Sequence, residues 1–318
     1  MAILMSSGKE VRLAVIDFLF TIVYAIGVSC TGATVAVLAP YVASDDETSV
    51  ALLLAITVVQ VAGFGGAADA LGGASYNPLT NLINYLADED DETALSLLLR
   101  FPAQAGGMVI GTMLTWEFIP ESLKHTVDGP ALPPGVSVLA GATAEFTLTF
   151  LLYLVVMWTL FLGPSSDLSK AFIMVSATIV AIAAGMGFSG PSLNPFFAFG
   201  WVYTLDQEMS VQHFLVYWAA PTAGAVLAAA FYRIYLKPHK AALEEKRRKE
   251  REGKEGKAEE RGRGEEEALR DSRETKGVAA EREGEGLRKR VGAGGREEEE
   301  KGRENMNSGG GEGRNKAE

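Results

Sequence analysis

Six long apolar segments constrain this chain more than any other feature of its sequence. They occupy residues 11–38, 49–68, 94–116, 136–162, 168–188 and 211–236. A bilayer has a hydrocarbon core about 30 Å thick, and a helix of roughly 20 apolar residues is needed to cross it. The segments therefore predict an all-α membrane protein with six transmembrane helices. We expect the first segment to act as an uncleaved insertion signal.

Charge divides the chain into two parts. Residues 237–318 contain 23 of the 29 Lys and Arg residues and 22 of the 40 Asp and Glu residues, whereas residues 1–236 contain the other 6 and 18. The second part has few apolar residues, so burial cannot offset its chain entropy. We predict a membrane domain over residues 1–236 and a disordered, charged cytoplasmic tail over residues 237–318. Residues 241–251 have Glu–Lys spacings that favour a transient helix.

The distribution of basic residues predicts the orientation of the helices. Lys9 and Arg12 lie at or just before the start of the first segment, Arg100 lies near the start of the third, Lys170 lies at the start of the fifth, and the basic tail follows the sixth. All of these fall on one side if the segments alternate in direction, and the loops of the other side contain only Lys124. Because loops rich in Lys and Arg stay in the cytoplasm, both termini are predicted to be cytoplasmic.

Two further apolar stretches are too short to cross a membrane, and each begins with an Asn-Pro pair. They start with Asn77-Pro78-Leu79 and Asn194-Pro195-Phe196. A single Asn-Pro pair is typical of an ordinary turn or helix cap. Asn is a good cap residue and Pro is favoured at the first helical position, so both stretches are predicted to be short helices. Short apolar segments at matching positions in two halves indicate a transporter or channel site.

An internal repeat relates the two halves of the membrane domain. Asp-Phe-Leu-Phe-Thr at 17–21 resembles Glu-Phe-Thr-Leu-Thr at 145–149, and Ala-Gln-Ala-Gly-Gly at 103–107 resembles Ala-Pro-Thr-Ala-Gly at 220–224. The Asn-Pro pairs and these last segments share one offset, since 194 − 77 and 224 − 107 both equal 117. Each half, about residues 10–116 and 136–236, contains three predicted membrane helices. An odd number places the halves inverted across the membrane, with their shared site near its midplane.

This pattern resembles the major intrinsic proteins, the aquaporins and glycerol facilitators, whose signature is Asn-Pro-Ala in two copies. Three segments are more narrowly similar to the plant small basic intrinsic proteins. They are Leu-Gly-Gly-Ala-Ser-Tyr-Asn-Pro at 71–78, Arg-Phe-Pro-Ala-Gln at 100–104, and Gly-Pro-Ser-Leu-Asn-Pro at 190–195 followed by Ala-Phe-Gly-Trp at 198–201. The resemblance covers about residues 10–236. It implies an aquaporin-like bundle of six helices with two re-entrant half-helices, a homotetramer, and a location in the endoplasmic reticulum membrane of a plant cell.

The resemblance also implies a mechanism. The N-termini of the two half-helices would meet at the centre of a pore, where Asn77 and Asn194 would donate side-chain N–H groups to a passing water. The positive ends of the helix dipoles would repel cations there. Nothing in the pattern supplies a nucleophile with its base, so we expect no enzyme activity. We predict a passive channel for water or small neutral solutes. A secondary transporter and a non-conducting membrane scaffold remain the alternatives.

A second constriction departs from the family pattern. The resemblance assigns it to Thr57, Ile182, Pro191 and Phe197. The usual residue at the last of these positions is Arg, so this filter is predicted to be apolar and to lack a fixed cation. Leu79 and Phe196 also stand where the family has a small Ala. The sequence leaves open whether these bulky side chains enter the pore or pack outward against the helices.

Two acidic residues, Asp17 and Glu145, fall inside predicted membrane helices. Ionisable groups at membrane depth are costly and are usually paired or functional. The resemblance implies that they accept backbone N–H bonds and so brace the re-entrant loops, whose irregular backbone needs internal partners. A proton relay is the alternative.

The remaining expectations concern partners. Cys30 is the single cysteine, which excludes an intrachain disulfide and a thiolate metal cluster. We expect no metal, no cofactor and no nucleic acid. Water or small neutral solutes and membrane lipids are the expected partners, and the sequence names none for the tail.

Overall fold

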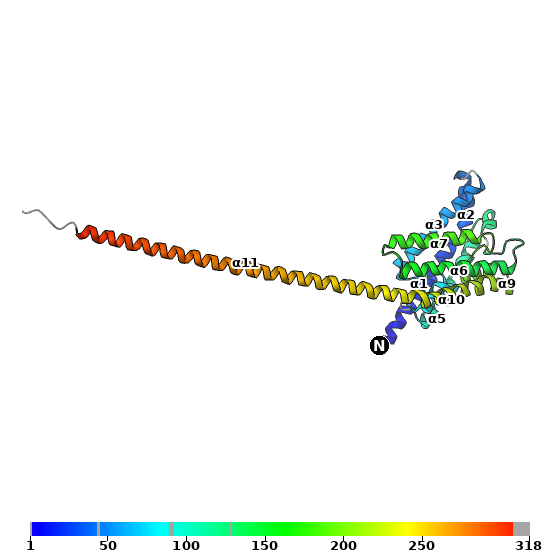
Figure 1. The fold of residues 1–318 in the computed structure, drawn as a ribbon. Coiled ribbons are helices and arrows are strands. Elements are labelled where there is room, and N and C mark those ends of the chain that lie inside the picture. The colour runs from blue at the N-terminus through cyan, green and yellow to red at the C-terminus, as the bar shows by residue number, and fades with distance from the viewer. Residues whose placement is uncertain (1, 43–44, 89–91, 128, 308–318) are drawn as a thin grey trace, which may run out of the picture. The chain divides into compact units, whose positions relative to one another are not determined.

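The computed structural model describes residues 2–42, 45–88, 92–127 and 129–307 of this chain. Two compact units make up the molecule, Met1–Ala242 and Leu243–Glu318. Regular structure in the described residues is helical throughout. Figure 1 shows the helices of the first unit gathered side by side in a bundle.

Six helical stretches in the described part of the chain are long and apolar enough to cross a membrane, as the sequence predicts. The first five are built from α1 (Ala2–Ser29) with α2 (Thr31–Val42), α3 (Asp46–Ala70), α5 (Ala94–Phe118), α6 (Val138–Phe161) and α7 (Asp167–Gly185). The sixth begins with α9 (Val211–Phe214), η2 (Leu215–Ala219), α10 (Ala220–Phe231) and η3 (Tyr232–Leu236), and it continues without a break into the polar helix that follows. A short turn of helix, η1 (Glu121–Thr126), follows α5.

Two short helices begin at the Asn-Pro pairs. They are α4 (Pro78–Ala87) and α8 (Pro195–Thr204), of 10 residues each. The short helix of each half packs on the last long helix of the other half, since α4 contacts α10 and α8 contacts α5. The two halves therefore interlock through their half-helices.

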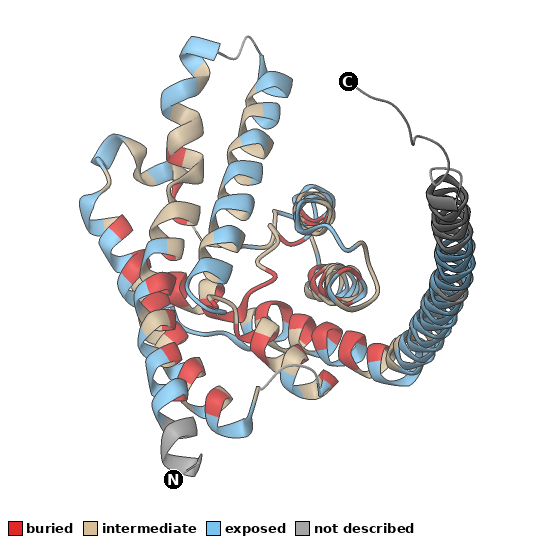
Figure 2. Cartoon of the chain, turned by 90° about the vertical axis from the view of Figure 1, so that its left-hand side faces the viewer, coloured by how far each residue is buried: buried red, intermediate tan, exposed pale blue. Residues whose placement is uncertain are grey.

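The surface of the bundle is apolar in the pattern that a lipid-facing helix requires. On α1 the side chains of Val11, Val15, Leu19 and Val23 are exposed, and they follow one another at intervals of four. Residues four apart lie on one face of a helix, so this stripe faces outward. Figure 2 shows the buried residues gathered on the inward sides of the helices, with exposed residues on the outward sides.

Glycines let the long helices approach closely in both halves. A methyl group at Gly107 of α5 would collide with the carbonyl oxygen of Phe18 in α1, and one at Gly224 of α10 would collide with that of Phe146 in α6. Small residues at such contacts replace the hydrophobic drive that is absent between helices in lipid. The two glycines are 117 positions apart, so the repeat includes this packing contact.

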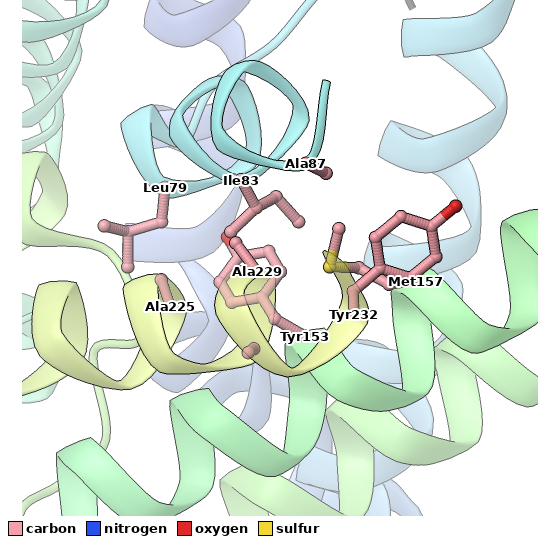
Figure 3. Close-up of a cluster of buried hydrophobic side chains, with 9 residues drawn as sticks. Leu79, Ile83, Ala87, Tyr153, Met157, Ala225, Ala229 and Tyr232 are labelled. Carbon is pink, nitrogen blue, oxygen red and sulfur yellow. The ribbon is translucent and has the colours of Figure 1, made fainter. Parts of the chain in front are cut away.

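Part of the core forms around α4. Leu79 and Ile83 of this helix pack with Tyr153 and Met157 of α6 and with small residues of α10, as Figure 3 shows. Leu79 is 2% exposed in this cluster. The bulky residue that follows the first Asn-Pro pair therefore packs against the surrounding helices, which answers one question that the sequence leaves open.

The tail differs from the sequence-based expectation. Residues predicted to be disordered form a helix, α11 (Lys237–Asn307), in the structure. Its side chains make ion pairs at intervals of four, including Glu245–Lys249 at 2.8 Å and Glu285–Lys289 at 3.4 Å. Such pairs stabilise a helix without any buried face, although each exposed pair contributes only about 0.3–0.5 kcal/mol. Residues 308–318, also predicted to be disordered, lie outside the described residues.

Candidate functional site

The two asparagines cap the half-helices that follow them. The Asn77 Oδ1 atom accepts a hydrogen bond from the Leu79 N–H at 3.1 Å, and the Asn194 Oδ1 atom accepts one from the Phe196 N–H at 3.1 Å. Asn194 also accepts from the Phe197 N–H at 3.4 Å. A side-chain oxygen in this position satisfies backbone donors that have no partner within the helix. Capping therefore fixes the oxygen of each amide and turns its nitrogen away from the helix.

The freed nitrogens tie the two re-entrant loops to each other. The Asn77 Nδ2 atom donates to the Leu193 carbonyl oxygen at 2.8 Å, and the Asn194 Nδ2 atom donates to the Tyr76 carbonyl oxygen at 2.9 Å. Each asparagine thus bonds the residue that precedes the other. This reciprocal pair of bonds brings the N-termini of α4 and α8 together inside the bundle.

A charged network surrounds the first loop. Asp17 is fully buried and accepts from the Ser75 N–H at 2.8 Å, from the Arg100 Nε atom at 2.7 Å and from the Gln104 Nε2 atom at 2.7 Å. Arg100 also donates to the Gly73 carbonyl oxygen at 2.7 Å. Both kinds of backbone group in the loop are therefore bonded, since Asp17 accepts from an N–H group and Arg100 donates to a carbonyl oxygen.

Neutral donors surround the second loop. Glu145 is fully buried and accepts from the Ser192 N–H at 2.9 Å, the Leu193 N–H at 3.1 Å and the Ser189 hydroxyl at 3.0 Å. The Tyr217 hydroxyl donates to the Ser189 carbonyl oxygen at 2.5 Å. Residue 217 stands 117 positions after Arg100, so a tyrosine holds this loop where an arginine holds the first.

Leu193 carries the backbone strain of the second loop. Its φ angle is 50°, in the left-handed region that costs a non-glycine residue about 1–2 kcal/mol. The bond from its N–H to Glu145 and the bond from Asn77 to its carbonyl together hold this conformation. Strained residues held in this way are frequent at functional sites.

A cavity of about 1100 Å³ runs past both asparagines. Its walls include the four residues that the sequence assigns to a second constriction. The residues of the two groups that line it are Asn77, Asn194, Thr57, Ile182, Pro191 and Phe197. These residues come from four separate parts of the chain, and the structure brings them to one space.

The other members of the two Asn-Pro motifs are not among the residues that line this cavity. All four are buried within the protein: Pro78, Leu79, Pro195 and Phe196. The Phe196 ring meets the Phe101 ring edge-on at 5.9 Å and lies in a core cluster. Phe196 therefore packs outward like Leu79, and the two bulky replacements leave the cavity open.

Sequence reasoning missed the role of Arg100. The sequence predicts that Arg100 is a loop cation on the cytoplasmic side. In the structure it is only 3% exposed, and it pairs with Asp17 and, at 3.2 Å, with Glu92. Arg100 and Gln104 are four residues apart, so they lie on one face of the helix and can bond the same partner, here Asp17. This spacing was the signal in the sequence that could have revealed the role of Arg100. The orientation argument then rests on Lys9, Arg12, Lys170 and the tail.

An aromatic cluster beside the first loop was also missed. The Tyr24 and Tyr76 rings stack at 3.9 Å between centroids, and the Phe64 ring meets the Tyr24 ring edge-on at 5.2 Å. All three residues line the cavity next to Asn77. Their separation in the sequence gives no sign that they meet.

Arg100 pairs with Asp17 and Glu92, and the charged residues Lys9, Glu10 and Asp69 also line the cavity. Within the described ranges, no group of three or more His, Cys, Asp or Glu side chains is placed to hold a metal ion. Beside Asn77 and Asn194, the wall offers neutral amide groups and helix N-termini to whatever occupies the cavity.

Comparisons with known proteins agree with one another. The sequence pattern of a family described as Major intrinsic protein matches residues 5–232. Aquaporin SIP1-1 of Oryza sativa subsp. japonica is 37% identical over 234 residues, which cover 72% of this chain and 94% of that protein. Aquaporin SIP1-1 of Arabidopsis thaliana is 39% identical over 167 residues, covering 52% and 69%.

A solved structure has a similar fold. It is the X-ray structure of the aquaglyceroporin from Plasmodium falciparum, with a TM-score of 0.58 and 20% sequence identity. The match covers 73% of this chain and 99% of that one.

Proposed function

This chain belongs to the major intrinsic protein family, and we propose that its conduction path is the cavity in which Asn77 and Asn194 meet. The chain is a multi-pass membrane protein and a passive channel for water or small solutes, not an enzyme.

One observation supports the path above all others, the reciprocal bonding of the two asparagines on the cavity wall. An amide nitrogen carries two hydrogens, and each asparagine donates one of them to a carbonyl oxygen of the opposite loop. The second hydrogen of Asn77 is left for a water oxygen in the cavity, and the Asn194 side chain also bonds the Tyr24 hydroxyl, which lines the same cavity. The N-termini of α4 and α8 meet here, each with about half a positive charge, so cations are repelled while neutral molecules pass.

Asp17 and Glu145 act in this proposal as braces of the re-entrant loops. Their bonds to the N–H groups of Ser75, Ser192 and Leu193 support that role. Irregular backbone inside a membrane needs such partners. A relay of protons would need a chain of exchangeable groups, whereas Asp17 is bonded to the guanidinium of Arg100.

The filter is proposed to consist of Thr57, Ile182, Pro191 and Phe197. It lacks the arginine usual at the last position, and the Thr57 hydroxyl donates to the Leu53 carbonyl of its own helix at 2.8 Å. A ring of apolar side chains offers little to replace the hydration of water and favours dewetting of a narrow pore. The Phe197 side chain lines the cavity, so we expect it to limit water permeability.

Phe197→Ala tests this filter in purified protein reconstituted into liposomes. Water permeability should rise several-fold, and glycerol or urea should enter, because the ring no longer narrows the cavity. The measurement is light scattering during osmotic shrinkage, normalised to the protein incorporated. Phe199→Ala is the matched control, since Phe199 lies on the same helix and contacts Tyr203 and Trp218. An unchanged rate and solute profile in well-folded Phe197→Ala would remove this residue from the filter.

The orientation, the membrane and the oligomeric state of the channel are also proposals. We infer that both termini are cytosolic, which the positions of Lys9, Arg12 and Lys170 support. The named relatives are aquaporins of plants, and the subfamily resemblance supports an endoplasmic reticulum membrane and a homotetramer.

A further inference from the structure

Gln60 is a polar residue of the cavity wall to which neither the repeat nor the filter assigns a role. It lies on α3 three residues after Thr57, close to one helical turn, and its side chain is partly buried and lines the cavity. A polar amide inside a membrane helix is costly unless it finds partners.

Two bonds fix how the amide is turned. The Gln60 Nε2 atom donates to the Gly27 carbonyl oxygen at 2.8 Å. The Thr31 hydroxyl shares its single hydrogen between the Gln60 Oε1 atom at 2.9 Å and the Val28 carbonyl oxygen at 2.7 Å. A carbonyl oxygen can only accept, so the nitrogen of the amide must face Gly27. Gln60 thus bonds both sides of the junction between α1 and α2.

The two bonds leave hydrogen-bonding capacity unused. The nitrogen of the amide carries two hydrogens and the described contacts engage one of them. The oxygen has two acceptor positions, and Thr31 occupies one. One N–H donor and one acceptor position therefore remain for a molecule in the cavity.

Three hydroxyl groups on the wall have no hydrogen left to donate to the cavity. The Thr57 hydroxyl donates to the Leu53 carbonyl at 2.8 Å, that of Thr178 to the Met174 carbonyl at 2.9 Å, and that of Ser192 to the Asn194 carbonyl at 2.7 Å. A hydroxyl has a single hydrogen, so these groups present only acceptor positions to the cavity. The second N–H of Gln60 is therefore available where the hydrogens of these three hydroxyl groups are not.

We propose that Gln60 is a specificity-determining residue of the channel, an amide donor that acts in series with Asn77 and Asn194. It binds the oxygen of water or of a small neutral solute such as urea near the filter, where Phe197 stands in place of an arginine. An arginine there would supply a fixed charge and several donors. A neutral amide supplies one donor without charge. The inference rests on the proposed conduction path through this cavity.

Gln60→Met tests the proposal, because methionine has a similar length and no N–H group. Reconstituted Gln60→Met should conduct water several-fold more slowly than the wild type at equal protein content. Thr34→Val is the matched control. It removes a hydroxyl one turn after Thr31 in α2 that donates to the Cys30 carbonyl at 2.8 Å and does not line this cavity, so it should conduct at close to the wild-type rate.

The possible outcomes separate the role of the donor from a structural role. Wild-type water permeability in Gln60→Met overturns the proposal, and so does an equal loss in Thr34→Val, which would assign the effect to packing near the α1–α2 junction. If Gln60→Met fails to fold, Gln60→Glu replaces it, since glutamate keeps the acceptor for Thr31 and loses the amide hydrogens. Slow water flow through Gln60→Glu supports the proposal, and wild-type flow contradicts it. A wild-type protein that conducts no faster than empty liposomes contradicts the conduction path itself.

Discussion

The two buried carboxylates hold equivalent loops by different means. Asp17 faces a guanidinium group, whereas the bonded partners of Glu145 are two backbone N–H groups and a hydroxyl. A buried charge with a charged partner and one with neutral partners respond differently to substitution. Removing one member of a buried ion pair leaves the other uncompensated, at a typical cost of about 3–5 kcal/mol.

Asp17→Asn should therefore destabilise the protein more than Glu145→Gln. The first change leaves Arg100 without its main counter-charge, while the second weakens charge-assisted bonds typically worth about 1.5–3 kcal/mol each. Thermal unfolding of both variants in detergent measures the difference, and the midpoint should fall further for Asp17→Asn. Equal midpoints would contradict the asymmetry. A stable, assembled Glu145→Gln that no longer conducts would favour a relay or filter role for Glu145.

At the scale of elements, close contacts between helices define the bundle. Gly107 and Gly224 occupy matching positions in α5 and α10, and each meets the backbone of a partner helix. Adjacent positions on α5 differ sharply in this respect. A methyl group at Gly106 would meet the Phe18 ring at an ordinary 3.5 Å, whereas one at Gly107 would lie 3.0 Å from the Thr21 Cβ atom and collide with the Phe18 carbonyl.

Gly107→Ala should lower the yield of folded protein, and Gly106→Ala should not. Both changes add the same methyl group to the same helix, so helix propensity favours both equally. The difference comes from the contact between α1 and α5. Size-exclusion profiles and unfolding midpoints of the two variants measure it. A Gly107→Ala protein as stable as Gly106→Ala would mean that α1 and α5 do not meet at this glycine.

The sequence predicts the elements that depend on local pattern. The six membrane helices, the half-helices at Asn77 and Asn194, and the resemblance to the small basic intrinsic proteins are all confirmed. Hydrophobic length and helix caps are local signals, so they can be read directly. The internal repeat also predicts equivalent positions in the two halves, such as Gly107 and Gly224.

Side-chain direction could not be predicted in the same way. Leu79 and Phe196 pack outward because neighbouring helices offer them apolar contacts, and the motif itself is silent on this point. Arg100 turns inward because Asp17, 83 positions away, supplies its counter-charge. The bonds of Gln60 to Gly27 and Thr31 likewise depend on how α3 packs against its neighbours.

At the scale of the whole molecule, the two interlocked halves enclose one cavity that both asparagines line. At the two asparagines the wall presents neutral amides and helix N-termini, while Asp17 and Glu145 are bonded to the protein itself. This arrangement favours passive flow over coupling to an ion gradient. The central claim is therefore that neutral molecules pass through this channel passively.

The most direct test is osmotic flow through liposomes that contain the purified protein. Water flow should exceed that of empty liposomes, should reverse with the osmotic gradient, and should be unaffected when a proton or sodium gradient is imposed across the membrane. Transport of a solute uphill under either gradient would instead make the protein a secondary transporter. Flow equal to that of empty liposomes, for water, glycerol and urea alike, would indicate a non-conducting scaffold and contradict the account.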